Sequence, residues 1–279
     1  MYQRNLDSVS LISSDGKSEI SGKTVRGTMS SRGDTRKQAV LRDRMIKKSG
    51  TRRSAYVSKI LSVLKPGMNS VDIGCGTAHI IRELAVARKR SAVIGLDLSR
   101  AMIEVAKENL AGSDNVGLLV ADGLTLPFPD QAFDIAITRL AEYSPKEAYR
   151  ILKKGGTFLE FGLGPDADKE ILEFFPERID TESFFFPSNP REWKQEISHP
   201  IERAGFIVLD ADEYKESDYY RNVNELMDLI ELVPLVKDFD RKKDKSQVAK
   251  LAKKYKEKRG IKITWHYYIT VARRPPPSH

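Results

Sequence analysis

The chain has 279 residues, of which 40% are hydrophobic and 31% charged, a composition that favours a soluble domain with a sizeable core. No apolar run reaches the roughly 20 residues of a membrane span, and the N-terminus lacks a signal-peptide core, so we expect no membrane association. The single cysteine, Cys75, excludes disulfides within the chain and a structural cysteine–zinc cluster, and it favours a reducing, cytoplasmic setting.

The net charge of +8 is unevenly distributed along the chain. Residues 1–55 carry thirteen basic and five acidic residues, and residues 237–260 carry eleven basic and four acidic ones. Residues 56–236 hold twenty basic and thirty acidic residues, so the body of the chain is acidic. Basic segments of this kind can bind nucleic acid, although a solvated tail or helix face is the commoner outcome.

Residues 1–45 have few apolar positions and no sustained period, which predicts a disordered basic N-terminal arm. Met29 and Met45 precede better-patterned sequence, so the start of translation is open between these two residues and Met1. We expect one domain over residues 46–279.

The first predicted elements centre on residues 70–80 (SVDIGCGTAHI), after a helix from residue 54 that stops at Pro66-Gly67. Residues 70–74 predict a buried strand, which is followed by a tight glycine turn and a helix start. Gly74 can adopt backbone angles that are closed to other residues, and Gly76 lets a ligand approach the main chain. The unpaired N–H groups of the helix start suit an anionic ligand group.

Strands and helices then alternate, which predicts a doubly wound parallel α/β sheet of seven strands. The further strands are expected over 92–97, 116–121, 133–138, 157–161, 206–209 and 261–273. The further helices are expected over 78–88, 99–111, 145–152, 191–204, 223–232 and 247–258. Residues 211–260 are too many for a plain hairpin connection, so we interpret them as a lid or substrate insertion.

Two of these strands end in an acidic residue. Asp97 stands about 20 residues beyond the glycine turn, a spacing that lets a carboxylate hold two ribose hydroxyls. Asp122, followed by Gly123, ends the next strand. His79 replaces the third glycine of the dinucleotide fingerprint, and the sequence contains no phosphate-binding G-x-x-x-x-G-K-[ST] loop. The pattern therefore indicates a nucleoside ligand other than a nicotinamide dinucleotide.

Five motifs in this order resemble the class I S-adenosylmethionine-dependent methyltransferases, nearest to the group with small-molecule and quinone methyltransferases. They are Asp72-Ile73-Gly74-Cys75-Gly76-Thr77, GLDLS at 95–99, the pair Ala121-Asp122-Gly123 and Leu126-Pro127-Phe128, Phe133-Asp134, and LKKGG at 152–156. The resemblance is close over residues 55–163. It implies a Rossmann-like sheet with an antiparallel last strand, and S-adenosyl-L-methionine as the cofactor.

The resemblance also implies which residues bind the adenosine part of the cofactor. Asp97 would hold the ribose and Leu98 would lie against the adenine face. Asp122 would accept a hydrogen bond from the adenine amino group, while Gly123 would let the backbone approach the adenine ring. The alternative for Asp97 is a helix N-cap, a role that Ser99 fills better.

The remaining cofactor-binding residues belong to the glycine turn and to the end of the fourth strand. Asp72 would orient the turn and the amino end of the cofactor, and a buried acid in a strand needs hydrogen bonds in any case. The turn supplies Gly74, Gly76 and Thr77. Arg139 belongs to the segment TRLAEY, residues 138–143, with which the family touches the methionine portion and the acceptor.

No catalytic base stands out. Cys75 matches a position that the family fills with a small residue, and His79 is more often a packed, hydrogen-bonded residue than a base. His266, Glu142 and Tyr143 are candidates for acid–base or positioning roles, with structural roles as the alternative. Because the acceptor can attack the methyl group in line, a strong base is not required.

The predicted function is methyl transfer to a small-molecule acceptor held between the sheet edge and the 211–260 insertion. The alternative is methylation of an rRNA or tRNA base, with the basic arm and residues 237–260 contacting phosphates. The aromatic residues of 174–176 and 184–187 either wall the acceptor pocket or pack a long connection onto the core. The oligomeric state is left open.

Overall fold

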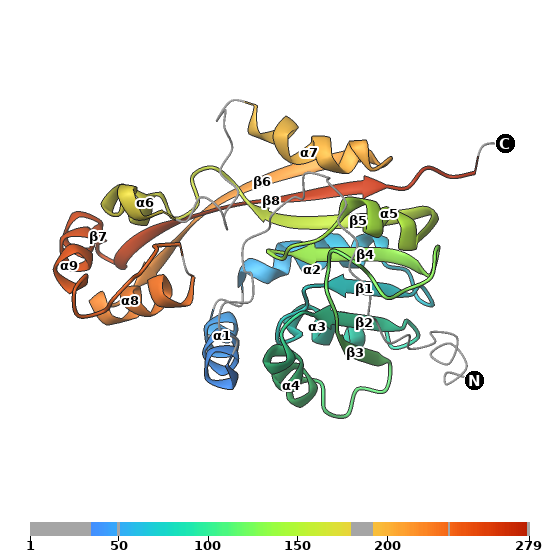
Figure 1. Cartoon of the computed structure of the whole chain (residues 1–279), viewed down its shortest axis with the longest axis horizontal. Helices are drawn as coiled ribbons and strands as arrows, with labels where there is room; N and C mark the ends of the chain where they lie inside the picture. Colours follow the sequence, from blue (N-terminus) through green and yellow to red (C-terminus); the bar gives the residue numbers. More distant parts are fainter. Residues whose placement is uncertain (1–34, 49–50, 180–191, 234, 278–279) are drawn as a thin grey trace.

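The protein folds around one mixed sheet with helices on both faces (Figure 1). A computed structural model describes residues 35–48, 51–179, 192–233 and 235–277. In sheet order, the main strands are β3 (Val116–Val120), β2 (Val93–Asp97), β1 (Ser70–Ile73), β4 (Phe133–Arg139), β5 (Leu152–Leu163), β8 (Gly260–Arg273) and β6 (Ile207–Tyr220). The first five are parallel, and β8 is antiparallel to both of its neighbours. The predicted fold is confirmed, with a two-residue strand β7 (Lys256–Glu257) added beside β8.

The order of the strands reverses between β1 and β4, and this reversal creates the crevice of the sheet. From β1 the chain adds β2 and β3 on one side and then crosses to β4 on the other side. β1 is buried along its whole length, which explains its short apolar sequence. Its register pairs Ile73 with Leu96 of β2 and with Thr138 of β4, so the residues that follow these strands meet at one edge.

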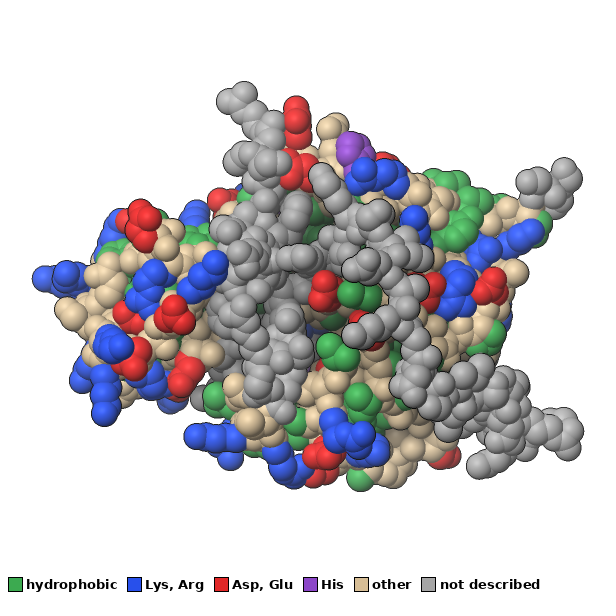
Figure 2. Space-filling view, in the orientation of Figure 1, with side chains coloured by type: hydrophobic (Ala, Val, Ile, Leu, Met, Phe, Trp, Pro, Cys, Tyr) green, Lys and Arg blue, Asp and Glu red, His purple; other side chains and the backbone are tan. Residues whose placement is uncertain are grey.

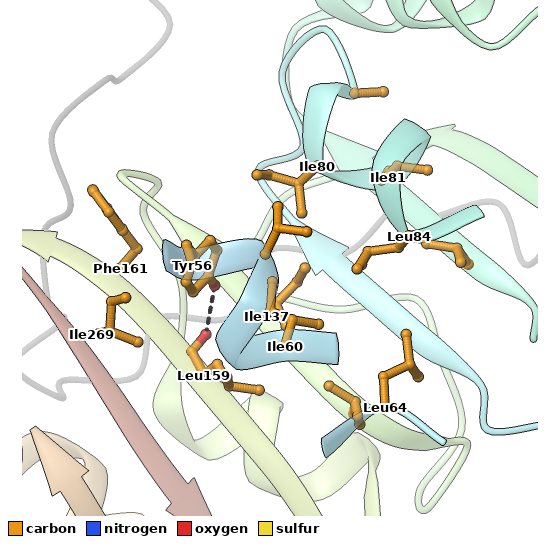
Figure 3. Packing of buried hydrophobic residues seen from close by; sticks show 14 of the residues in the cluster. Tyr56, Ile60, Leu64, Ile80, Ile81, Leu84, Ile137, Leu159, Phe161 and Ile269 are labelled. Atoms are coloured by element: carbon orange, nitrogen blue, oxygen red, sulfur yellow. Dashed lines mark hydrogen bonds between the residues drawn. The ribbon is translucent and has the colours of Figure 1, made fainter. Parts of the chain in front are cut away.

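Two hydrophobic cores lie on opposite faces of this sheet. The helices on the first face are α2 (Thr51–Val63), α3 (His79–Ala87) and α4 (Arg100–Asn109). The helices on the second face are α5 (Pro145–Ile151) and α7 (Trp193–Arg203). Figure 3 shows the first core, in which the fully buried Tyr56 of α2 donates from its hydroxyl to the carbonyl oxygens of Thr138 (2.8 Å) and Leu159 (3.1 Å). These bonds fix α2 beside the carboxyl end of β4.

A third core lies where β6 and β8 extend beyond the sheet as a two-stranded ribbon (Figure 1). The helices that pack there are α6 (Lys169–Phe174), α8 (Val223–Leu232) and α9 (Lys245–Lys254). Ile171, Leu226 and Leu251, one from each helix, are buried in this core. The buried Glu170 accepts hydrogen bonds from the backbone N–H (2.8 Å) and hydroxyl (2.5 Å) of Thr264, which ties α6 to β8. We call α6, α8, α9, β7 and the ribbon ends 216–220 and 260–264 the ribbon subdomain.

The prediction of a disordered arm over residues 1–45 is wrong for residues 36–45, which belong to α1 (Arg36–Lys48). Ala39 of this helix is fully buried with Met102 and Val105 of α4. Polar side chains make much of the contact between α1 and the rest of the protein, so few positions of this helix are apolar. Sequence analysis that looks for an apolar helical period therefore misses it. Residues 1–34 lie outside the described residues.

The sixth strand is much longer than the prediction over 206–209. β6 continues to Tyr220 because β8 pairs with it as far as Ile261, so the first part of the expected 211–260 insertion is strand. One face of the ribbon is polar, and this polarity concealed the strand in the sequence. The helix predicted over 247–258 ends at Lys254, where the chain turns into the hairpin of β7 and β8.

The aromatic residues after β5 have a structural role where the structure describes them. Phe175 is buried in the core of the ribbon subdomain. Its ring packs edge-to-face with the ring of Phe239, and the two ring centres are 6.3 Å apart. The Phe184-Phe185-Phe186 run, the other part of the expected aromatic wall, lies outside the described residues. Within the described ranges, no helix is both long and apolar enough to cross a bilayer.

Candidate functional site

A cavity of about 170 Å³ lies at the crevice edge of the sheet. The residues that line it come from α1, from the turn between β1 and α3, and from the ends of β2, β3 and β4. All nine residues that the sequence predicts to bind the cofactor are among them: Asp72, Gly74, Gly76, Thr77, Asp97, Leu98, Asp122, Gly123 and Arg139. The fold thus places them around one space, while their individual binding roles remain predictions.

Two glycines allow backbone segments to close around this cavity. Gly74 has φ 76°, and a Cβ atom there would lie 2.1 Å from the Cβ of Ala141. A Cβ atom on Gly123 would lie 2.5 Å from the carbonyl oxygen of Glu142. Because no other residue fits at either position, the segment after β4 can approach both the glycine turn and the end of β3.

Asp97 connects the glycine turn to the end of β2. Its Oδ2 accepts a hydrogen bond from the backbone N–H of Gly76 (2.8 Å), and its Oδ1 accepts one from the N–H of Ser99 (2.9 Å). The N-cap of α4 is Ser99, whose hydroxyl accepts from the N–H of Met102 (3.2 Å). Asp97 is therefore not the cap, and a carboxylate with about four lone-pair sites keeps capacity for ribose hydroxyls.

Asp72 makes the inner wall of the cavity acidic. The side chain is 2% exposed, and burial, followed by the charge of Asp97, raises its pKa to about 7, while the Arg139 guanidinium acts in the opposite direction. Two carboxyl groups that repel each other in a buried wall are stabilised by a cation. The cavity therefore suits a ligand that brings positive charge near Asp72 and hydroxyl groups near Asp97.

Two residues of α1, Arg42 and Ile46, also line the cavity, and the sequence analysis missed them. They lie four positions apart, so they share one face of the helix. No motif marks them, because they precede the glycine turn by about 30 residues and residues 36–45 of α1 were expected to be disordered. Their distance from the turn in the sequence hides a contact that only the fold creates.

Cys75 and His266 lie in surroundings that favour structural roles. Burial, followed by the charges of Asp72 and Asp97, raises the pKa of Cys75 well above its ordinary value, so this thiol stays protonated. His266 is fully buried, accepts a hydrogen bond at Nδ1 from the N–H of Asp166 (3.0 Å) and has Nε2 3.0 Å from Glu213 Oε1. Because its ring is fully buried and Nδ1 is occupied by the Asp166 N–H, His266 is a packed histidine.

The two candidates after β4 differ in their surroundings. Glu142 lines the cavity, whereas Tyr143 is 1% exposed in the core of the second sheet face. Tyr143 lies against Glu160, whose pKa burial raises to about 7, while the hydroxyls of Tyr143 and Tyr268 oppose that increase. Tyr143 is therefore part of a buried polar group beside the cavity, and Glu142 alone of the pair faces the ligand space.

A methyltransferase domain model matches residues 71–156, a range that includes all nine predicted cofactor-binding residues, from Asp72 to Arg139, and all the turns described above. This part of the chain is therefore similar to methyltransferase domains. The sulfonium charge, amino group and ribose of S-adenosylmethionine, the cofactor that the sequence motifs imply, correspond to the ligand that the acidic cavity suits.

Curated relatives match 36% of the chain. A demethylmenaquinone methyltransferase of Desulfitobacterium hafniense is 40% identical over 110 residues, covering 36% of this chain and 44% of that protein. A malonyl-[acyl-carrier protein] O-methyltransferase of Legionella pneumophila is 31% identical over 108 residues, covering 36% of this chain and 38% of that protein. The chain thus spans less than half the length of these curated relatives.

Solved structures agree with the fold over a longer part of the chain. The YcgJ protein of Bacillus subtilis superimposes with a TM-score of 0.56 at 19% identity, covering 78% of this chain and 97% of that one. The [4+2]-cyclase SpnF gives a TM-score of 0.53 at 20% identity, covering 80% of this chain and 82% of that one. At this identity, the similarity shows the fold alone.

Proposed function

We propose that the protein is an S-adenosylmethionine-dependent methyltransferase whose acceptor is a small molecule. The observation that carries the proposal is the convergence of nine predicted cofactor-binding residues on one acidic cavity of a methyltransferase domain. The relatives described above are named for demethylmenaquinone and malonyl-[acyl-carrier protein], and neither name is that of a nucleic acid. A cytoplasmic setting, expected from the single cysteine, belongs to the same proposal.

When bound, S-adenosylmethionine supplies an electrophilic methyl group on a positively charged sulfur. Asp97 would accept hydrogen bonds from the ribose hydroxyls, and Asp122 would accept one from the adenine amino group. Asp72 attracts the charged amino end, and its ionised form compensates the positive charge of the ligand. These residues would hold the methyl group in line with the acceptor. Such positioning can lower the activation free energy by up to about 7–11 kcal/mol.

The acceptor belongs between the end of β4 and the ribbon subdomain. The Arg139 guanidinium lies 4.9 Å from the centre of the Phe161 ring, Phe161 stacks on Tyr267 at 4.8 Å, and Tyr267 stacks on Tyr214 of β6 at 4.9 Å. This continuous array joins the wall of the cofactor cavity to the ribbon. Packed aromatic support of this kind keeps Arg139 in place against an acceptor.

Exposed lysines of the ribbon subdomain are the feature that RNA binding would use. Figure 2 shows Lys and Arg side chains projecting around this end of the molecule, and Lys250, Lys253 and Lys256 are exposed on or beside α9. They lie on the outer surface of the subdomain and are not among the residues that line the cofactor cavity. A small acceptor therefore agrees better with the described part of the chain.

Two measurements test the proposal. Calorimetry should show binding of S-adenosylmethionine and of S-adenosylhomocysteine, with no binding of a nicotinamide dinucleotide. Incubation with methyl-labelled cofactor and fractionated cell extract should place label in the small-molecule fraction. Label found only in RNA would show that the acceptor is RNA and not a small molecule. A preference for the dinucleotide in calorimetry would contradict the methyltransferase proposal.

A further inference from the structure

The attachment of α1 beside the cofactor cavity is a buried polar junction. Asp43, which is 6% exposed, has Oδ1 2.8 Å from His79 Nε2 and Oδ2 2.6 Å from Lys47 Nζ. Asn109 of α4 donates from Nδ2 both to Asp43 Oδ1 (2.8 Å) and to the carbonyl oxygen of Thr77 (2.9 Å). One amide thus joins α1 to the turn that forms the floor of the cavity.

The charge on Asp43 is stabilised where it lies. Burial acts to raise the pKa of Asp43, but the hydrogen bonds from Lys47 and Asn109 and the charge of His79 bring it below the ordinary value. Asp43 is therefore ionised at neutral pH, and removal of its charge would leave His79 and Lys47 without their common partner. The junction is specific to the docked position of α1.

The docked helix directs two of its side chains at the ligand space and touches the substrate side as well. Arg42 and Ile46, which flank the Asp43 junction, line the cavity together with Leu98 and Met102, where the adenosine part of the cofactor is expected. α1 also contacts α8 of the ribbon subdomain. A single helix is thus shared by the cofactor cavity and the subdomain that we propose to hold the acceptor.

We infer that α1 is the outer wall of the cofactor site, that the cofactor must pass it on release, and that it couples cofactor occupancy to the ribbon subdomain. This inference rests on the proposed function for the identity of the ligand. Arg42 and Ile46 are cofactor-contacting residues, and the Asp43–His79–Asn109 junction holds them in place. Bound cofactor therefore stabilises α1, and the stabilised α1 in turn restrains α8.

The experiment measures backbone hydrogen exchange in α1 and the dissociation rate of S-adenosylhomocysteine, which serves as the probe. In the full-length protein, hydrogen exchange should slow in residues 36–48 and 223–232 when the probe binds. In a stopped-flow displacement assay, Asp43→Asn should raise the dissociation rate of the probe by about tenfold, the effect of losing hydrogen bonds to one charged group. Arg42→Ala should raise the rate similarly without faster exchange of α1 in the ligand-free protein.

A matched control lies on the same helix. Arg36 pairs with Glu108 through side chains that are 55% and 58% exposed, so Arg36→Ala should leave the dissociation rate within about twofold of the wild type. Probe binding with unchanged exchange in α1, or a wild-type dissociation rate in both folded variants, would overturn the inference and leave the proposed function standing. A wild-type protein that binds no probe would overturn the proposed function itself.

Discussion

At the scale of single residues, Asp97 can be separated from its neighbour Ser99. Asp97→Ala removes the partner of the Gly76 N–H and of the expected ribose hydroxyls. We expect the dissociation constant for S-adenosylmethionine, measured by calorimetry, to increase by the equivalent of about 1–3 kcal/mol. Ser99→Ala removes the N-cap of α4 instead, so it should lower the free energy of unfolding by about 1 kcal/mol and leave that constant unchanged. Equal affinity of a folded Asp97→Ala protein and the wild type would remove Asp97 from the site.

Asp72 gives cofactor binding a dependence on pH. Its pKa of about 7 in the ligand-free protein reflects burial first and the charge of Asp97 second. A cationic ligand favours the ionised carboxyl, so affinity is complete above this pKa and is lost as the pH falls through it, by up to about tenfold per pH unit. Calorimetry between pH of about 6 and about 8 should show this loss. The Asp72→Asn protein should lack that component, and parallel profiles of the two proteins would contradict the assignment.

At the scale of elements, burial on both sides explains which strands the sequence predicts. β1, β2 and β4 are covered on both faces, so they form short apolar runs that end at the glycine turn, Asp97 and Arg139. The outer half of β6 has no such cover, and its charged sequence conceals it until β8 is known to be its partner. The meeting of the nine predicted residues around one cavity was predictable because they lie at or just beyond strand ends within local motifs. Arg42 was not, because its contact with the cavity depends on the docking of α1.

α9 allows a test that separates a lid role from an RNA-binding role. Leu251 is fully buried in the subdomain core, whereas Ala249 on the same helix is exposed. Leu251→Asp buries a charge at a cost of several kcal/mol, so methyl transfer to a small acceptor should fall more than about tenfold, while Ala249→Asp should be nearly neutral. Steady-state turnover of the two purified variants measures the difference.

Exposed lysines of α9 and of the neighbouring β7 allow the opposite outcome to be tested. Lys254 is paired with Glu173, so the charge reversal is best made at Lys250, Lys253 and Lys256. With a small acceptor, this triple variant should retain turnover within about twofold, and turnover should depend little on salt. A dead triple variant together with a steep decline in turnover with salt concentration would establish phosphate contacts instead.

At the scale of the whole molecule, the position of β8 has a consequence for biosynthesis. β8 is the last strand in the chain, yet it lies between β5 and β6 and contributes Ile261 and Ile263 to the subdomain core. The strands from β1 to β5 can assemble while translation continues. Until residues 260–273 leave the ribosome, however, β5 presents an open edge and β6 has no partner. A nascent chain that stalls before residue 260 therefore exposes a sheet edge able to recruit other chains, and chaperones have most to protect in that interval.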